Sequence, residues 1–291
     1  SYLEVTAPPS GELGKITFEP DGSVKLTTGT LDYGQGHATP FAQVLSAELG
    51  VPFEKITLEQ GDSDLVRFGN GTGGSRSSTA TGQAIVEASA LVVEKGKQAA
   101  AHLLEASEGD IEFANGRFTI AGTDRSIGIM ELAQRLRDGK APEGTPSSLD
   151  VDHATKEIPS TFPNGCHVAE VEIDPETGVT RIVRYFAVND FGTVVNPMIV
   201  AGQLHGGVAQ GIGQALMEEV SYDESGQPIT GSFMDYAMPR AEDIPPMAVG
   251  DHPSPAQSNP PGTKGCGEAG CAGRLVCLAT AALAPPVSYK H

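Results

Sequence analysis

The chain has 291 residues, which is enough for one large domain or two ordinary domains with real hydrophobic cores. Its formal net charge of −18 argues against nucleic acid or an anionic membrane as a partner, because both need Lys and Arg to neutralise phosphate. No apolar run is long enough for a membrane span and no signal peptide opens the chain, so we expect a cytoplasmic protein. The first residues already resemble a strand and lack an initiator Met, so we also expect a fragment or processed chain, which leaves room for an upstream targeting segment.

In the first half, the pattern predicts short strands and three helices before a linker. The expected strands are 15–18, 24–28, 56–60, 111–113 and 117–120, and the expected helices are 39–49, 79–104 and 127–136. Pro20-Asp21-Gly22 and Asn115-Gly116 are typical of hairpin turns. Residues 139–148 are rich in Pro, Gly and Ser, which favours a linker and two domains, 1–146 and 147–291.

The second half repeats this order of elements. We expect a hairpin of strands 167–173 and 180–189, a helix over 199–219 with many small residues, an irregular Pro-rich stretch at 243–261 and an apolar helical segment at 275–283. The fold class that follows is α+β, with two-layer helix-on-sheet subdomains and mixed or antiparallel sheets.

Glu268 is the single carboxylate in the Gly-rich run 260–273. Such a backbone can approach a ligand closely, and a Gly-rich turn ahead of a helix can direct free N–H groups at an anion. A carboxylate at this place can serve as a general base. The alternative is a tight turn with one solvated Glu.

Two further segments, 28–39 with 69–78 and 190–197 with 202–213, combine Gly with the neutral donors Gln, Ser, Thr and Asn. Neither has the spacing of a phosphate loop or a dinucleotide fingerprint. They suit a large polar ligand with phosphates and amide-like ring edges. Arg76 stands among Gly and Ser, where it is a candidate phosphate partner or simply a surface cation.

The four cysteines, Cys166, Cys266, Cys271 and Cys277, lack the C-x-x-C spacing of zinc and redox sites. We expect free thiols, with a zinc site of three Cys and one His as the alternative. The strand residue His167 is expected to be a packing residue.

Four runs occur together and in order: G-Q-G-x-x-T, G-G-S-R-S-S, G-Q-x-x-G-G and K-G-x-G-E-A-G. In combination they resemble the molybdenum hydroxylases, the xanthine dehydrogenase and aldehyde oxidase family. The likeness is to the C-terminal half of the molybdopterin-binding large subunit, especially of carbon-monoxide-dehydrogenase-like members. The resemblance implies that cofactor-binding residues are Gly34, Gln35, Gly36, His37, Thr39, Thr72, Gly73, Gly74, Ser75, Arg76, Ser77, Ser78, Gln203, Lys264, Gly265 and Cys266. It implies that Glu268 is the catalytic base.

The same resemblance implies the cofactor and the partners. The cofactor is molybdopterin cytosine dinucleotide with molybdenum, held without a direct protein side-chain ligand to the metal. The reaction is hydroxylation or oxidation of a small carbonyl, N-heterocyclic or CO substrate, with water as the oxygen source. Partner chains supply the N-terminal half of the molybdenum subunit, FAD and [2Fe-2S] clusters, so we expect the isolated chain to be inactive. The alternative is a non-catalytic binding or assembly module of a larger complex.

Overall fold

The computed structural model describes residues 1–7, 11–139 and 144–283, and the chain forms two compact units. The N-terminal unit comprises Ala7–Ser160 and Ala256–Thr263, and the C-terminal unit comprises Ser1–Thr6, Thr161–Pro255 and Lys264–His291. Residues 140–143 of the predicted linker lie outside the described residues, and the domain boundary at 146/147 stays a prediction.

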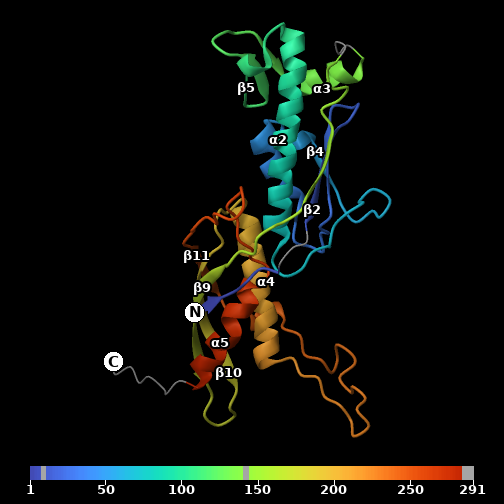
Figure 1. Cartoon of the computed structure of the whole chain (residues 1–291). Helices are drawn as coiled ribbons and strands as arrows, with labels where there is room; N and C mark the ends of the chain where they lie inside the picture. Colours follow the sequence, from blue (N-terminus) through green and yellow to red (C-terminus); the bar gives the residue numbers. More distant parts are fainter. Residues whose placement is uncertain (8–10, 140–143, 284–291) are drawn as a thin grey trace. The chain divides into compact units, whose positions relative to one another are not determined.

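The N-terminal unit is built on two sheets and three helices (Figure 1). The larger sheet has the order β4-β3-β2-β8, in which β3 pairs with β2 antiparallel and with β4 parallel. The smaller sheet is antiparallel, in the order β5-β6-β7. The elements are β2 (Glu12–Phe18), β3 (Val24–Thr28), α1 (Ala38–Leu49), η1 (Phe53–Lys55), β4 (Ile56–Glu59), α2 (Ser77–Leu104), η2 (Glu108–Asp110), β5 (Ile111–Ala114), β6 (Arg117–Ile120), β7 (Ser126–Gly128), α3 (Ile129–Arg137) and β8 (Val151–Thr155).

Apolar residues at helical spacing place both long helices of this unit against its core. In α1, Phe41, Leu45 and Leu49 recur every four residues and are all buried, and the helix ends at Gly50 in the left-handed conformation. Helix α2 approaches β2 so closely that a Cβ on Gly14 would lie 2.5 Å from the carbonyl oxygen of Ala84. This packing holds α1 and α2 against the core. Each helix follows a Gly-rich loop, so the end of each loop is held in place as well.

The C-terminal unit is a four-stranded mixed sheet in the order β1-β9-β10-β11, packed against two helices (Figure 1). Strands β9 and β10 are antiparallel, whereas β10 and β11 are parallel. The elements are β1 (Tyr2–Leu3), β9 (Asn164–Ile173), β10 (Thr180–Asp190), α4 (Pro197–Leu216), η3 (Ala241–Asp243), β11 (Met247–Asp251) and α5 (Ala269–Leu283). Helix α4 starts where Asn196 Oδ1 accepts the N–H of Ile199 at 3.0 Å, with Pro197 in the first turn.

Helices α4 and α5 meet through glycines. A Cβ on Gly207 would lie 3.1 Å from Gly270 Cα, and a Cβ on Gly270 would lie 2.5 Å from the backbone nitrogen of Val208. Larger residues at either place would force the helices apart. The small residues of α4 therefore let the two helices pack closely.

The α+β class with helices on mixed and antiparallel sheets is confirmed, and three element predictions need correction. Residues 127 and 128, predicted as the start of a helix, belong to strand β7 (Ser126–Gly128), because this segment pairs with β6. Helix α4 stops at Leu216 instead of 219, since Met217 leaves the helical conformation and the carbonyl of Gly213 accepts both following N–H groups. The stretch 243–261 is not wholly irregular, because β11 forms there by pairing with β10. None of the described helices is long and apolar enough to cross a membrane.

Candidate cofactor-binding site

The two Gly-rich loops of the N-terminal unit lie at the same edge of its larger sheet. Strands β3 and β4 are parallel neighbours, so the loop that leaves β3 for α1 and the loop that leaves β4 for α2 both start at the carboxyl ends of the strands. Ligands of open α/β sheets bind at such edges. The N–H of Gly71 donates to Gly29 O at 3.2 Å, and the N–H of Leu31 donates to Thr72 Oγ1 at 3.2 Å. The structure thus brings the predicted segments 34–39 and 72–78 together.

The backbone of the first loop is occupied by its own carboxylate. Asp32 Oδ1 accepts the N–H of Gly34 at 2.7 Å and of Gly36 at 3.2 Å, and Oδ2 accepts the N–H of His37 at 2.7 Å. Burial alone would raise the pKa of Asp32, but these N–H groups together lower it. Gln35 Oε1 accepts the N–H of Tyr33 at 2.5 Å. The amide nitrogen of Gln35 can therefore still donate hydrogen bonds to a ligand.

His37 and Thr39 occupy the start of α1 and differ in their access to solvent. His37 is buried, its ring lies 4.8 Å from that of Phe41, and its Nδ1 lies 3.5 Å from Gln60 Nε2. Burial lowers the pKa of His37 against the opposing influence of Asp32, so the ring is neutral at pH 7. Thr39 is half-buried in the first turn. His37 therefore has a packing role at the end of the first loop.

The second loop ends at the N-terminus of α2, a helix of 28 residues with no acidic residue in its first turn. The N–H groups of Ser77, Ser78 and Thr79 donate to no acceptor among the described residues. Arg76 precedes them, and its Nη2 donates to Asn70 O at 2.7 Å. Free N–H groups at the positive end of a helix dipole, next to a guanidinium, form an arrangement that binds anions. Thr72 Oγ1 accepts from Ser77 Oγ at 3.1 Å and ties the loop to the helix.

The backbone leading into this helix uses unusual conformations. Gly74 has φ 61° and Ser75, which is not a glycine, has φ 55°. Two successive residues in the left-handed region turn the chain sharply just before α2. Gly73 is exposed, so the loop leaves its backbone accessible beside the helix N-terminus.

Glu12 is a buried carboxyl next to the start of the first loop, and it was not predicted from the sequence. It is 2% exposed, and its Oε1 accepts the N–H of Gly29 at 2.6 Å and of Leu13 at 2.8 Å. Burial raises the pKa of Glu12 to about 7, although the N–H donors and the nearby Arg76 oppose that effect. The only available signal was an acidic residue at the head of a strand that is otherwise buried.

In the C-terminal unit, Gln203 and Glu268 lie near the place where α4 and α5 meet. Gln203 is half-buried, one turn before Gly207, and its amide makes no hydrogen bond to a described residue. Glu268 is exposed and directly precedes α5, where its carbonyl accepts the N–H of Ala272 at 2.9 Å. Because Gly270 packs on Gly207, the same helix crossing fixes the backbone of both residues.

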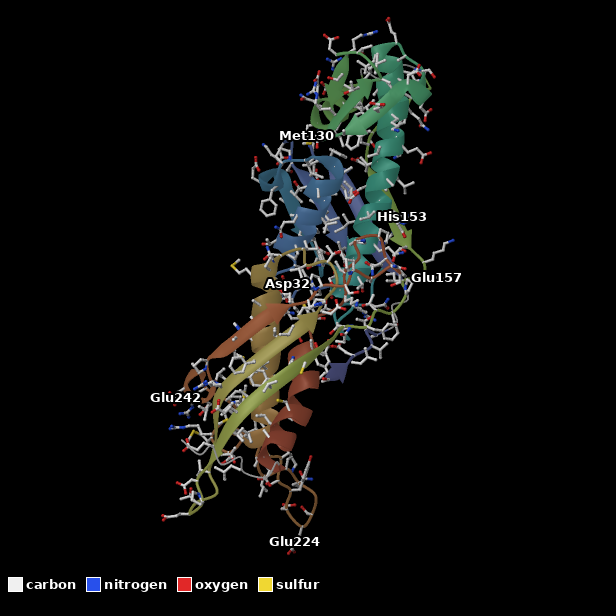
Figure 2. All side chains as sticks on the ribbon, turned by 90° about the vertical axis from the view of Figure 1, so that its left-hand side faces the viewer. Asp32, Met130, His153, Glu157, Glu224 and Glu242 are labelled. Carbon is white, nitrogen blue, oxygen red and sulfur yellow. The ribbon has the colours of Figure 1, made fainter. Side chains whose placement is uncertain are left out.

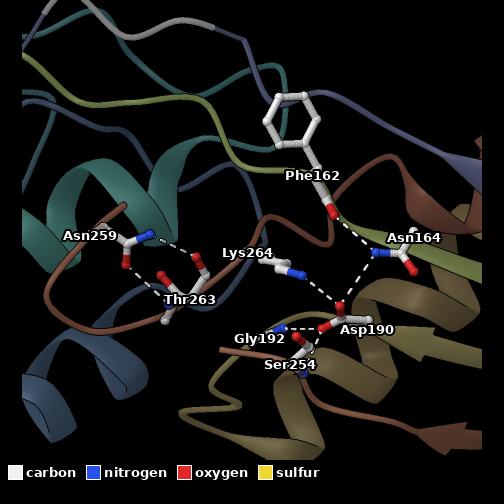
Figure 3. Close-up of polar contacts among 8 residues, drawn as sticks. All are labelled: Phe162, Asn164, Asp190, Gly192, Ser254, Asn259, Thr263 and Lys264. Atoms are coloured by element: carbon white, nitrogen blue, oxygen red, sulfur yellow. Dashed lines mark hydrogen bonds and ion pairs between the residues drawn. The ribbon is translucent and has the colours of Figure 1, made fainter. Parts of the chain in front are cut away.

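The segment that carries Glu268 is anchored to the end of β10. Lys264 Nζ lies 2.5 Å from Asp190 Oδ2, and both side chains are 12% exposed (Figure 3). The N–H of Lys264 donates to Phe191 O. Asp190 Oδ1 accepts the N–H groups of Gly192 and Ser254, each at 2.9 Å. Burial would raise the pKa of Asp190, but Lys264 and these N–H groups together lower it. Lys264 therefore serves this unit as a structural anchor.

Gly265 and Cys266 continue from this anchor towards Glu268. Gly265 is buried, and burial raises the pKa of the Cys266 thiol to about 12, with Glu4 and Glu268 adding to the effect. The thiol is thus neutral at pH 7, and the free form of all four cysteines matches the expectation. In the described part of the chain, no group of three or more His, Cys, Asp or Glu is placed to hold a metal ion.

His167 is a packed residue, as expected from its strand. Its Nδ1 lies 2.7 Å from Tyr185 Oη and its Nε2 lies 3.0 Å from Asn189 Oδ1, which also accepts from Tyr2 Oη at 2.8 Å. A Cβ on Gly273 would lie 2.5 Å from His167 Nδ1, so α5 covers the ring. This buried network joins β1, β9 and β10 to α5.

A family model for the molybdopterin cofactor-binding domain matches residues 2–245, most of the chain. The chain belongs to this molybdopterin cofactor-binding family. It is similar to the carbon monoxide dehydrogenase large chain of Afipia carboxidovorans, at 36% identity over 269 residues, which is 92% of this chain and 33% of that protein. It is also similar to the nicotine 6-hydroxylase large subunit of Paenarthrobacter nicotinovorans, at 36% identity over 258 residues, 88% of this chain and 32% of that protein.

A solved structure of reconstituted CO dehydrogenase from Oligotropha carboxidovorans matches with a TM-score of 0.90 and 34% identity, over 96% of this chain and 36% of that chain. The resemblance to the molybdenum hydroxylases is therefore confirmed. The chain spans about a third of the length of these relatives.

The residues of this molybdopterin cofactor-binding chain fit a dinucleotide-type pterin. The free N–H groups of 77–79 and Arg76 suit a pyrophosphate, with no acidic side chain in that turn to oppose it. The amide of Gln203, which has no hydrogen-bond partner among the described residues, suits the donor and acceptor edge of a pterin ring. The predicted role of the first loop becomes narrower. Asp32 already accepts the N–H groups of Gly34, Gly36 and His37, so this loop can contact a cofactor only with its side chains and the surface of its glycines.

Proposed function

We propose that this chain is the cofactor-binding part of a molybdenum hydroxylase that hydroxylates or oxidises a small carbonyl, N-heterocyclic or CO substrate. The single observation that carries the proposal is the start of α2, where Arg76 and three N–H groups with no acceptor among the described residues follow a Gly-rich loop in a chain of this family. The cofactor is molybdopterin cytosine dinucleotide. The N-terminal half of the molybdenum subunit and chains with FAD and [2Fe-2S] complete the assembly.

In the N-terminal unit, the proposed roles divide between charge and shape. The N–H groups of 77–79 and the guanidinium of Arg76 hold the pyrophosphate, because each can donate to negative charge and the first turn of α2 has no acidic residue. Gln35 donates from its remaining amide hydrogens. Gly34, Gly36 and the segment from Thr72 to Ser75 let the backbone come close, and Thr39 lines the start of α1.

In the C-terminal unit, Gln203 would orient the pterin through its amide, and Glu268 would accept the proton that is released when water supplies the oxygen atom. Glu268 is exposed and its backbone is fixed at the start of α5, a place that suits a carboxylate with a role in proton transfer. The ion pair of Lys264 with Asp190 holds the segment that leads there. When bound, the cofactor supplies the redox chemistry, and these residues supply position and proton transfer.

The test is Glu268→Gln in the complete assembly. Gln keeps the shape and much of the hydrogen bonding but cannot accept a proton at neutral pH. Turnover per molybdenum, measured with CO, aldehyde and N-heterocycle panels and an artificial electron acceptor, should fall by ~10²–10⁴-fold while metal content is unchanged. Glu224→Gln, an exposed carboxylate on a loop turn (Figure 2), is the matched control and should leave turnover intact.

Two outcomes oppose the proposal. A Glu268→Gln assembly with full metal and near-normal turnover would refute the base assignment. An unaltered assembly that binds neither molybdenum nor pterin would favour the alternative, a non-catalytic binding or assembly module.

A further inference from the structure

One face of the sheet in the C-terminal unit is covered by α4 and α5, and the other carries exposed apolar residues. On the covered face, His167, Tyr185 and Ala187 are at most 6% exposed. On the opposite face, the alternating residues Val168 and Phe186 are 56% and 44% exposed. Figure 1 shows both helices on one side of this sheet, and Figure 2 views the sheet from the other side.

Strand register gathers these exposed residues into one patch. Val168 pairs with Phe186, which pairs with Ala248, and Cys166 pairs with Val188 in the next row. Paired residues share a face, and rows two residues apart lie on the same side. All five are exposed, so we call Cys166, Val168, Phe186, Val188 and Ala248 the open sheet face.

The composition of the open sheet face is that of a buried surface. An antiparallel pair with one solvated face normally alternates apolar with polar residues, whereas 185–188 is apolar throughout. Polar residues limit the patch on both sides. In the next row on one side, Glu170 and Arg184 lie 3.5 Å apart. In the next row on the other side, Asp190 pairs with Asn164. A contiguous apolar patch with a polar rim marks an interaction site.

Two observations identify what covers this face. Family relatives carry about three times the length of this chain, so about two thirds of each molybdenum subunit lies outside the fold described here and is present once per copy of it. The net charge of −18 opposes both a second copy of this chain and an anionic lipid surface. We propose that the open sheet face is the docking surface for the remaining polypeptide of the molybdenum subunit, which covers it with an uncharged apolar surface.

This inference rests on the proposed function and has its own readout, because Cys166 lies in the patch. The chain alone and the chain co-expressed with the remaining polypeptide are pulse-labelled with N-ethylmaleimide, and modification is measured peptide by peptide. We expect rapid labelling of Cys166 in the isolated chain and several-fold slower labelling in the assembly. Cys266 is the internal control, since burial keeps its thiol neutral in this unit.

Substitutions test the same surface independently. Val168→Glu and Phe186→Glu should leave the thermal unfolding of the isolated chain unchanged, because both positions are exposed, and should weaken association with the remaining polypeptide by at least about 100-fold. Val179→Glu, in the hairpin turn and 64% exposed, is the matched control and should associate normally.

Equal labelling of Cys166 with and without the remaining polypeptide would overturn the proposal, as would normal association of both variants. Self-association of the isolated chain that Phe186→Glu abolishes would assign the face to a second copy instead. Binding to neutral phosphatidylcholine vesicles that the same variant abolishes would assign it to lipid. Normal association without molybdenum or pterin would sink the proposed function and leave the docking surface intact.

Discussion

Glu12 gives the N-terminal unit a pH dependence that can be worked out from its surroundings. In the unfolded chain the pKa of this carboxyl is near its ordinary value of 4.5, whereas burial raises the pKa in the folded chain to about 7. Between these values the folded state binds more protons than the unfolded state. The free energy of unfolding therefore falls as the pH rises from 4.5 to 7, and the loss is complete above that.

The size of the effect follows from the difference between the two pKa values. A shift from 4.5 to about 7 corresponds to roughly 3 kcal/mol, at 1.36 kcal/mol for each pKa unit. Glu12→Gln removes this titration, while its amide oxygen can still accept the N–H groups of Gly29 and Leu13. The new buried NH₂ adds a cost that does not depend on pH, so the difference between two pH values is the quantity to compare.

The assay is urea unfolding of the wild type and Glu12→Gln at pH 5 and pH 8.5, with hydrogen exchange at Gly29 as the local readout. We expect Glu12→Gln to gain about 2–3 kcal/mol relative to the wild type between the two pH values. The exposed Glu54→Gln is the matched control and should show no such gain. The same pH dependence in wild type and Glu12→Gln would refute the reasoning, because it would show that Glu12 is ionised and solvated in the folded chain.

Two further substitutions test the packing and the anion site. Gly270→Ala should lower the free energy of unfolding of the C-terminal unit by about 1–3 kcal/mol, because the added Cβ would press on Val208 N. The Cβ of Gly206→Ala meets nothing within 4 Å, so this control variant should melt no lower than the wild type. Equal melting of the two variants would contradict the helix contact. Arg76→Ala in the complete assembly should weaken cofactor retention by about 1.5–3 kcal/mol without changing turnover per bound molybdenum. Arg125→Ala, which also loses a bond to a backbone carbonyl, is its control, and unchanged molybdenum occupancy would leave Arg76 with a structural role only.

Local patterns in the sequence were enough to predict most of the elements. The hairpins and α1 follow from turn residues and helical spacing that act within a few residues, and α2 follows from a long run without breakers. Strand β11 was missed because it has little strand propensity and forms by pairing with β10, some sixty residues away. Strand β8 was missed for the same reason, since it depends on pairing with β2.

The candidate site shows the same division. The Gly-rich loops and Glu268 were found from composition, but that Asp32 fills the N–H groups of its own loop could not be read from spacing. Glu12 could not be found either, because its burial depends on how the loops after β3 and β4 close over β2. Sequence patterns do not predict the roles of side chains that depend on packing between residues far apart in the chain.

The most direct test of the central claim is the molybdenum and cytidine monophosphate content, the latter released by acid, of the complete assembly and of this chain alone. The account predicts one of each per assembly, neither in the isolated chain, and loss of both together in Arg76→Ala. An intact, correctly associated assembly that contains neither, or an isolated chain with stoichiometric molybdenum, would contradict it.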